Sequence, residues 1–280
     1  MNTSDTRIAI LGTGNIGAAI ARGLVGAGLF PAEHITLTRR KIEGLADFKK
    51  EGFQITSDNI VALSDADIVF IAVTPQQLNA LLSEISAALD ARRHTVVSIV
   101  SGATIAEMRK HLGRDVAIIR AMPNTAIAIR ESMTCLSTDG NTIGALPLVK
   151  KIFDSLGRTL VIDEGLMVPA TALCACGIAF FLRAIRAASQ GGIEIGFHAE
   201  DALLMAAQTA RGAATLLVQA GNHPEREVDK VTTPQGCTIS GLNQMEHNGF
   251  SSALIKGIVT SAEKAAVLYA PKTRANRHEE

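Results

Sequence analysis

The sequence predicts an α/β protein in which a mostly parallel sheet, covered by helices on both faces, precedes an all-helical region. Up to Asp163, short runs rich in Ile and Val alternate with helical patterns at the spacing of βαβ units. After Asp163 the strand patterns stop, and long Ala-rich helical patterns follow. The composition is 47% hydrophobic and only 4% aromatic, which is typical of closely packed helices on a buried parallel sheet.

The expected strands are short apolar runs bounded by turn or charged residues, which is the pattern of buried strands. In chain order they cover residues 7–12, 34–40, 66–73, 94–100, 115–122, 133–138 and 158–163. The helices expected between them cover residues 15–28, 42–51, 76–89, 104–112 and 141–157. The last of these helices ends at Gly157, since glycine commonly closes a helix.

The second half predicts helices over residues 164–190, 198–219 and 249–268, with a shorter one over 238–247. We therefore expect two domains, residues 1–163 and 164–270, and a disordered polar tail over 271–280.

The charge balance excludes several classes of partner. The chain has 27 basic and 27 acidic side chains, so no net field favours nucleic acid or an anionic membrane.

The N-terminus lacks the pattern of a signal peptide, so a cytoplasmic enzyme is the default expectation. Residues 165–182 are uncharged, and we expect a core or subunit-interface helix there, with a membrane span as the less favoured alternative.

The four cysteines are too few and too scattered for a disulfide framework. Cys174 and Cys176 form a C-x-C pair without a nearby His or a second pair, which is a poor zinc site, so no metal is expected. Small buried thiols in a helix are favoured over a metal or redox site.

The stretch "ILGTGNIG" carries the pattern G-x-G-x-x-G at Gly12, Gly14 and Gly17. It follows a strand and opens a helix, which is the context of a dinucleotide site. The glycines allow a tight turn, a close backbone approach to a pyrophosphate and helix packing, so the first domain is predicted to be Rossmann-like. Thr13, Asn15 and Ile16 belong to the same loop. The alternative is a strand–helix turn without a ligand.

The end of the second strand indicates which dinucleotide binds. NAD-specific sites usually have an acidic residue there, but this strand ends in Thr38, Arg39 and Arg40, and no acid follows before Glu43. Two guanidinium groups suit a 2′-phosphate, so NADPH is expected and NADH remains possible. The alternative is that the two arginines belong to a solvated turn.

Three later strand ends should face the same crevice, because parallel strands end at one edge of the sheet. The cofactor residues expected there are Val73, Thr74 and Pro75 after the third strand, Ser101 after the fourth and Asn124 after the fifth. Asn124 could reach the nicotinamide amide. Each of these positions, taken alone, is also compatible with an ordinary strand–loop junction.

The stretch "VTTPQGCTISGL" at 231–242 breaks the helical pattern of the second half. Together with "GTGNIG", "AVTPQQ", "RAMPNTA" and "MEHNGF", it makes the chain resemble the pyrroline-5-carboxylate reductase family over residues 7–268. The resemblance implies NADPH-dependent reduction of a cyclic imine to proline. It also implies a C-terminal helical domain that dimerises by interleaving helices, and often a larger homo-oligomer.

The resemblance also implies roles for particular residues. Asn59 falls where the family contacts the adenosine side of the cofactor, and Thr238 falls where a threonine hydrogen-bonds the imine nitrogen. The loop before this helix is expected to bind the substrate carboxylate, because a helix N-terminus offers free N–H donors. The expected substrate residues are Thr232, Thr233, Gly236, Cys237 and Thr238. The alternative is a plain turn at Pro234 and Gly236 with Thr238 as a helix cap.

The stretch 174–180 departs from the family. It has "CACGIAF" where the family has a sequence like "SGSGPAY", and Gln190 replaces an Asp of the family. Two alternatives therefore stay open. One is a related NADP-dependent reductase of another imine or a hydroxy acid, and the other is a catalytically impaired paralogue that binds NADPH.

Overall fold

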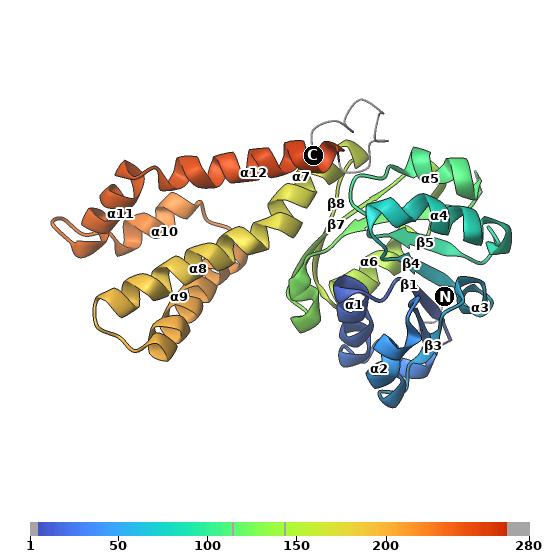
Figure 1. The fold of residues 1–280 in the computed structure, drawn as a ribbon. Helices are drawn as coiled ribbons and strands as arrows, with labels where there is room; N and C mark the ends of the chain where they lie inside the picture. The colour runs from blue at the N-terminus through green and yellow to red at the C-terminus, as the bar shows by residue number, and fades with distance from the viewer. Residues whose placement is uncertain (1–4, 114, 143, 268–280) are drawn as a thin grey trace, which may run out of the picture. The chain divides into compact units, whose positions relative to one another are not determined.

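The computed structural model describes residues 5–113, 115–142 and 144–267. Its sheet has the strand order β3-β2-β1-β4-β5-β6-β7-β8 (Figure 1). The strands are β1 (Ile8–Leu11), β2 (Ile35–Thr38), β3 (Gln54–Thr56), β4 (Ile68–Ile71), β5 (Thr95–Ser98), β6 (Ala117–Met122), β7 (Ser132–Thr138) and β8 (Gly157–Val161). Every neighbouring pair runs parallel except β6 and β7, which are antiparallel. The predicted α/β class is confirmed.

The helices of the sheet region cover both of its faces. They are α1 (Asn15–Gly26), α2 (Ala46–Lys50), α3 (Asn59–Leu63), α4 (Pro75–Ile85), α5 (Ile105–Leu112) and α6 (Leu146–Asp154). Alternate residues of β1 enter opposite cores, because successive side chains of a strand point to opposite faces. Ile8 and Ile10 pack in a core with residues of α1, α2 and α6, whereas Ala9 and Leu11 pack with residues of α3, α4 and α5.

All seven predicted strands form, but β3 and the short helix α3 were not predicted. Strand β3 has only three residues at the end of the sheet order, and none of them is buried. A strand this short and this exposed shows no run of buried apolar residues, so the sequence pattern does not reveal it.

The described residues form two compact units, one within 5–176 together with 261–267, and one over 177–260. Residues 164–176 belong to the first unit as 3₁₀-helix η6 (Glu164–Leu166), α7 (Met167–Ala170) and the π-helical segment η7 (Thr171–Cys176). Met167 and Ala170 pack against Met122 and Cys135 of the sheet. The domain limits at 163 and 270 remain predictions, and these contacts explain why the first compact unit continues beyond 163. The predicted disordered tail lies outside the described residues.

The second unit is helical, as predicted. It contains α8 (Gly177–Glu194), α9 (Ala199–Ala220), α10 (Pro224–Val231), α11 (Cys237–His247) and the part of α12 (Phe250–Val267) before Ser261. Helices α8 and α9 approach closely at Gly192, where an added Cβ would lie 3.0 Å from the Cβ of Ala202. Helix α10 was not predicted, because its sequence "PEREVDKV" is mostly charged.

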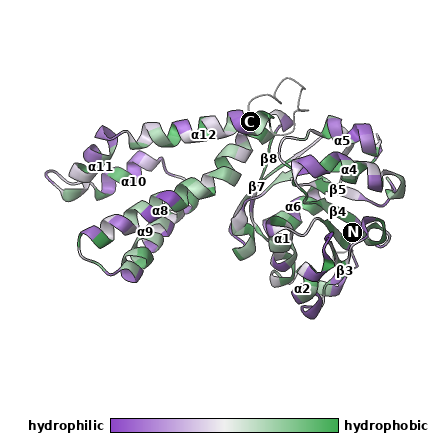
Figure 2. Cartoon of the chain, viewed as in Figure 1, coloured by the Kyte–Doolittle hydropathy of each residue, from purple (hydrophilic) through white to green (hydrophobic). Residues whose placement is uncertain are grey.

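Hydrophobic residues are concentrated in the strands of the sheet and also recur along α8 and α9 (Figure 2). On α8 and α9 many of them are exposed, among them Phe181, Leu182 and Leu204. Glu164–Glu194 is long and apolar enough to cross a membrane by length and composition alone. An apolar surface of this kind is also what a subunit interface needs.

Candidate cofactor-binding site

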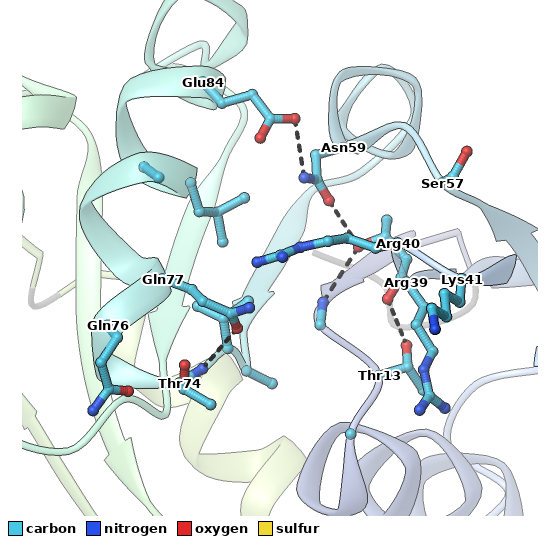
Figure 3. A pocket seen from close by; sticks show the side chains of 17 residues that line it. Thr13, Arg39, Arg40, Lys41, Ser57, Asn59, Thr74, Gln76, Gln77 and Glu84 are labelled. Atoms are coloured by element: carbon cyan, nitrogen blue, oxygen red, sulfur yellow. Dashed lines mark hydrogen bonds between the residues drawn. The ribbon is translucent and has the colours of Figure 1, made fainter. Parts of the chain in front are cut away.

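A pocket of about 530 Å³ lies where β1, β2 and β4 end (Figure 3). In the sheet, β1 lies between β2 and β4. The chain goes from β1 through β2 to β3 on one side and then continues with β4 on the other side of β1, so the strand order reverses here. Crevices at such a point are where open α/β sheets bind ligands. The predicted cofactor residues that line this pocket are Gly12, Thr13, Gly14, Thr38, Arg39, Arg40, Asn59, Val73 and Thr74.

The glycine loop has the geometry that its sequence requires. Gly12 has a φ of +96°, and an added Cβ would lie 2.8 Å from the Val73 side chain and 2.9 Å from the carbonyl oxygen of Ala72. At Gly17 an added Cβ would lie 2.5 Å from the carbonyl oxygen of Gly12. Gly14 is the N-cap of α1 without a side-chain cap, and no atom lies within 4 Å of its ideal Cβ position. The N–H groups that open α1 are therefore available to an anion in the pocket.

A chain of hydrogen bonds ties this loop to the neighbouring elements (Figure 3). The Gly12 N–H donates to Thr38 Oγ1 at 3.3 Å, and the Thr38 hydroxyl donates to Asn59 Oδ1 at 2.7 Å. Asn59 Nδ2 then donates to Glu84 Oε1 on α4 at 3.0 Å. The Thr13 N–H and hydroxyl both donate to the Thr38 carbonyl, at 2.9 and 3.1 Å. The loop is thus held at the end of β2 independently of any ligand.

The β2 end of the pocket is basic. Arg39, Arg40 and Lys41 follow β2 and line the pocket, and the side chain of Arg40 extends across it (Figure 3). Within the described part of the chain, none of the three forms an ion pair. Three unpaired cations without a carboxylate at the end of β2 suit a phosphate better than a ribose hydroxyl.

Several lining residues were not predicted, mainly on α4. Besides Lys41, Ser57 and Ala72, they are Gln76, Gln77, Ala80, Leu81 and Glu84. The spacing of the α4 residues is that of one helix face, because residues three and four apart are neighbours on a helix. Thr74 caps this helix and forms a capping box with Gln77. The start of this helix at Pro75 could therefore be predicted from the sequence. Helical spacing from Gln77 along the same face would have predicted Glu84 as a lining residue.

Six predicted cofactor residues do not line this pocket: Asn15, Ile16, Gly17, Pro75, Ser101 and Asn124. Asn124 caps a 3₁₀-helix, η4 (Thr125–Ile129), by accepting from the Ala126 N–H, and its Nδ2 donates to the Cys174 carbonyl at 3.3 Å. The Ser101 hydroxyl lies 3.9 Å from Met122 Sδ. That Asn124 reaches the nicotinamide amide, and that Ser101 faces the cofactor, remain predictions.

The predicted substrate loop lies in the helical unit. Gly236, not Thr238, is the N-cap of α11, which begins at Cys237, so the interpretation of Thr238 as a helix cap is wrong. Thr238 stands in the first turn and is half-buried. The Gly236 N–H donates to the Thr233 carbonyl at 3.0 Å, and an added Cβ on Gly236 would lie 2.6 Å from Thr233 Oγ1. No side chain caps α11, so its first N–H groups remain available as donors.

The Thr232 hydroxyl of this loop is engaged locally. Thr232 Oγ1 donates to the Val228 carbonyl at 2.8 Å.

Among the residues that the structure describes, no cluster of three His, Cys, Asp or Glu side chains could hold a metal ion.

Comparisons with known proteins agree with this architecture. A family model described as pyrroline-5-carboxylate reductase dimerisation matches residues 164–268, and one described as NADP oxidoreductase, coenzyme F420-dependent, matches residues 7–102. Pyrroline-5-carboxylate reductase 1 of Dictyostelium discoideum is 55% identical over 97% of this chain. The chain spans only 51% of that protein's length.

Two further relatives match this chain over almost its whole length and over almost their own whole length. Pyrroline-5-carboxylate reductase 2 of Dictyostelium discoideum is 50% identical over 98% of this chain and 96% of its own length. The structure of Plasmodium falciparum pyrroline carboxylate reductase with NADP bound has a TM-score of 0.87 at 24% identity, over 95% of this chain and 99% of that one. The chain therefore belongs to the pyrroline-5-carboxylate reductase family and is an NAD(P)H-dependent oxidoreductase.

Proposed function

We propose that this protein reduces 1-pyrroline-5-carboxylate to proline with NADPH. The observation that carries the proposal is the combination of a dinucleotide pocket with a basic end in the sheet unit and an uncapped, threonine-rich helix N-terminus in the helical unit. Both features occur in a chain whose family is named for this reaction.

The residues of the pocket fit NADPH. The uncovered Gly14 and the free N–H groups that open α1 would hold the pyrophosphate. Thr38, Arg39 and Arg40 would hold the 2′-phosphate, and Asn59 would contact the adenosine side. When bound, the cofactor supplies the hydride that reduces the imine carbon. NADH would fit the same pocket but would leave the arginines without their phosphate.

The substrate residues act on two groups of the cyclic imine. The uncapped N–H groups of α11, with Thr232, Thr233, Gly236 and Cys237 around them, would bind the carboxylate. The ring nitrogen must carry a proton to make its carbon a good hydride acceptor, and this N–H would donate to Thr238 Oγ1. The substrate motif holds no Asp, Glu or His as a general acid. Thr238 therefore orients a substrate that is already protonated, and orientation carries much of the rate.

We propose further that the chain works as a homodimer or larger homo-oligomer in the cytoplasm, with α8, α9 and α12 forming the contacts between subunits. The exposed apolar side chains of these helices support this assembly, because such surfaces are normally covered. The match to a dimerisation family over 164–268 supports it as well.

The departure at 174–180 supports a second candidate, a related NADP-dependent reductase with another substrate or a catalytically impaired paralogue. A panel of assays separates these functions. Oxidation of NADPH is followed with 1-pyrroline-5-carboxylate, with a larger cyclic imine carboxylate and, in reverse, with 3-hydroxy acids and NADP. Proline formed in equal amount to NADPH consumed supports the proposal. Turnover with another substrate only, or NADPH binding without any turnover, overturns it in favour of the second candidate.

A further inference from the structure

Two cysteines that are distant in the sequence meet in the sheet unit. Cys135 lies on β7, Cys174 lies in the π-helical segment η7, and their sulfur atoms are 4.0 Å apart. Around them, Met122, Met133 and Met167 complete a small apolar cluster that is separate from the two main cores. A distance of 4.0 Å places the two sulfurs in contact, and an S–S bond requires them to close to about 2.0 Å.

The two thiols differ in access and in acidity. Cys135 is buried, whereas Cys174 is half-buried and open to a small oxidant. The hydrogen bond from the Cys135 thiol lowers the pKa of Cys174 to about 7. The same hydrogen bond, together with burial, raises the pKa of Cys135. The more accessible thiol is thus also the one with more thiolate at neutral pH, and thiolate is the nucleophilic form.

We propose that Cys135 and Cys174 form a peroxide-sensitive thiol pair, in which Cys174 is oxidised first and Cys135 resolves it as an intramolecular disulfide. The Cys174 thiolate attacks one oxygen of hydrogen peroxide, which breaks the O–O bond and gives a sulfenic acid and, with one proton, water. The Cys135 sulfur then attacks the sulfenic sulfur. The S–S bond forms, the S–O bond breaks, and hydroxide leaves with the Cys135 proton as water. Two thiols lose two electrons, and peroxide is reduced to two waters.

This pair lies beside a residue that is expected to serve the cofactor. The Cys174 carbonyl accepts a hydrogen bond from Asn124 Nδ2 at 3.3 Å, so η7 helps to position Asn124. A disulfide would draw η7 and β7 together and change that contact. Cys176 lies in the same segment and is also half-buried, but no other sulfur contacts it in the described structure. It therefore serves as a matched control.

Peptide mapping of the full-length protein tests the pair without relying on its activity. The reduced protein is treated with hydrogen peroxide, unreacted thiols are alkylated, and the chain is cut with trypsin under non-reducing conditions. Cleavage at lysine and arginine places Cys135 in the peptide 131–150, and both Cys174 and Cys176 in the peptide 159–183. We expect these two peptides to become linked, and two of the chain's four thiols to be lost and then restored by dithiothreitol.

Three cysteine variants identify which thiols react with peroxide and with each other. Cys176→Ser should form the same linked peptides as the wild type. Cys174→Ser should form none and keep its remaining thiols. Cys135→Ser should accumulate a sulfenic acid on Cys174 that dimedone traps; if that variant fails to fold, the other two variants and the wild-type map still decide. Linkage that disappears in Cys176→Ser, linkage through Cys237, or four thiols that survive peroxide in the folded wild type would overturn the proposal.

Discussion

The sheet unit and the helical unit satisfy their apolar residues in opposite ways. In the sheet unit Ile10, Phe70 and Phe153 are fully buried. In the described residues of 177–260, Ala202 is the only buried hydrophobic side chain, while Leu204 is 70% exposed and Phe181 61% exposed. Burial of one large apolar side chain stabilises a fold by about 1.5–3 kcal/mol. The first unit therefore carries its own core, whereas the second must obtain much of its stability from another surface.

The largest expected effect concerns that surface. The double substitution Phe181→Glu and Leu204→Glu should dissociate the assembly to monomers, because each unpaired carboxylate in an apolar interface costs several kcal/mol. Sedimentation velocity or light scattering at several concentrations measures the change. Ile129 is 72% exposed in the sheet unit, and Ile129→Glu is the matched control that should leave the assembly intact. An unchanged oligomer in the double variant would remove α8 and α9 from the interface.

The core of the sheet unit gives the next largest effect. Phe70→Ala should lower the free energy of unfolding by about 3–5 kcal/mol, since a large ring is lost from a closely packed site. Phe70 also makes an edge-to-face contact with Phe153 at 5.9 Å between ring centroids. Urea unfolding, monitored by circular dichroism, measures the loss. A loss below about 1 kcal/mol would contradict the view that this unit is stabilised by its own core.

The third prediction concerns NADPH binding at the glycine loop. Gly12→Ala should weaken NADPH binding by about 100-fold, roughly 2.7 kcal/mol, because its φ of +96° and the close Val73 side chain leave no room for a Cβ. Gly26→Ala at the end of α1, the helix that follows the glycine loop, is the control, since nothing lies within 4 Å of its ideal Cβ position. Titration calorimetry should show normal affinity for that control. Equal affinity in both variants would argue against the pocket as the cofactor site.

The smallest effect tests the basic end of the pocket. Arg40→Ala should lower the preference for NADPH over NADH by up to about tenfold, as expected for one partly exposed charge–phosphate contact. The ratio of kcat/KM for the two cofactors measures it. Arg92→Ala changes an exposed arginine that does not line the pocket and should leave the ratio unchanged. If both variants behave alike, Arg40 belongs to a solvated turn.

Features with a long local pattern were predictable from the sequence. The seven main strands and the glycine loop follow from runs of Ile and Val and from the spacing of Gly12, Gly14 and Gly17. Strand β3 and helix α10 were missed because one has only three residues and the other is mostly charged. Strand β3 is defined by its pairing with β2, which a local pattern does not record.

Contacts between residues distant in the sequence could not be predicted from local patterns either. Glu84 reaches Asn59 from α4, and Cys174 meets Cys135 across 39 positions of the chain. The prediction of small buried thiols in a helix considered each cysteine separately. The structure shows Cys174 and Cys176 half-buried in a π-helical segment. The alternative that Thr238 caps α11 was wrong by two residues, because Thr238 has a side chain that could cap a helix whereas Gly236, the N-cap, has none.

The most direct test of the central claim is a joint measurement of turnover and NADPH affinity in Thr238→Ala, with 1-pyrroline-5-carboxylate as substrate. If the sheet unit binds the cofactor and the helical unit orients the imine, kcat should fall by about tenfold or more, as for loss of one hydrogen bond to a charged group. The dissociation constant for NADPH should stay within about twofold of the wild-type value. Unchanged turnover, or a loss of NADPH affinity as large as the loss of turnover, would contradict this division of roles.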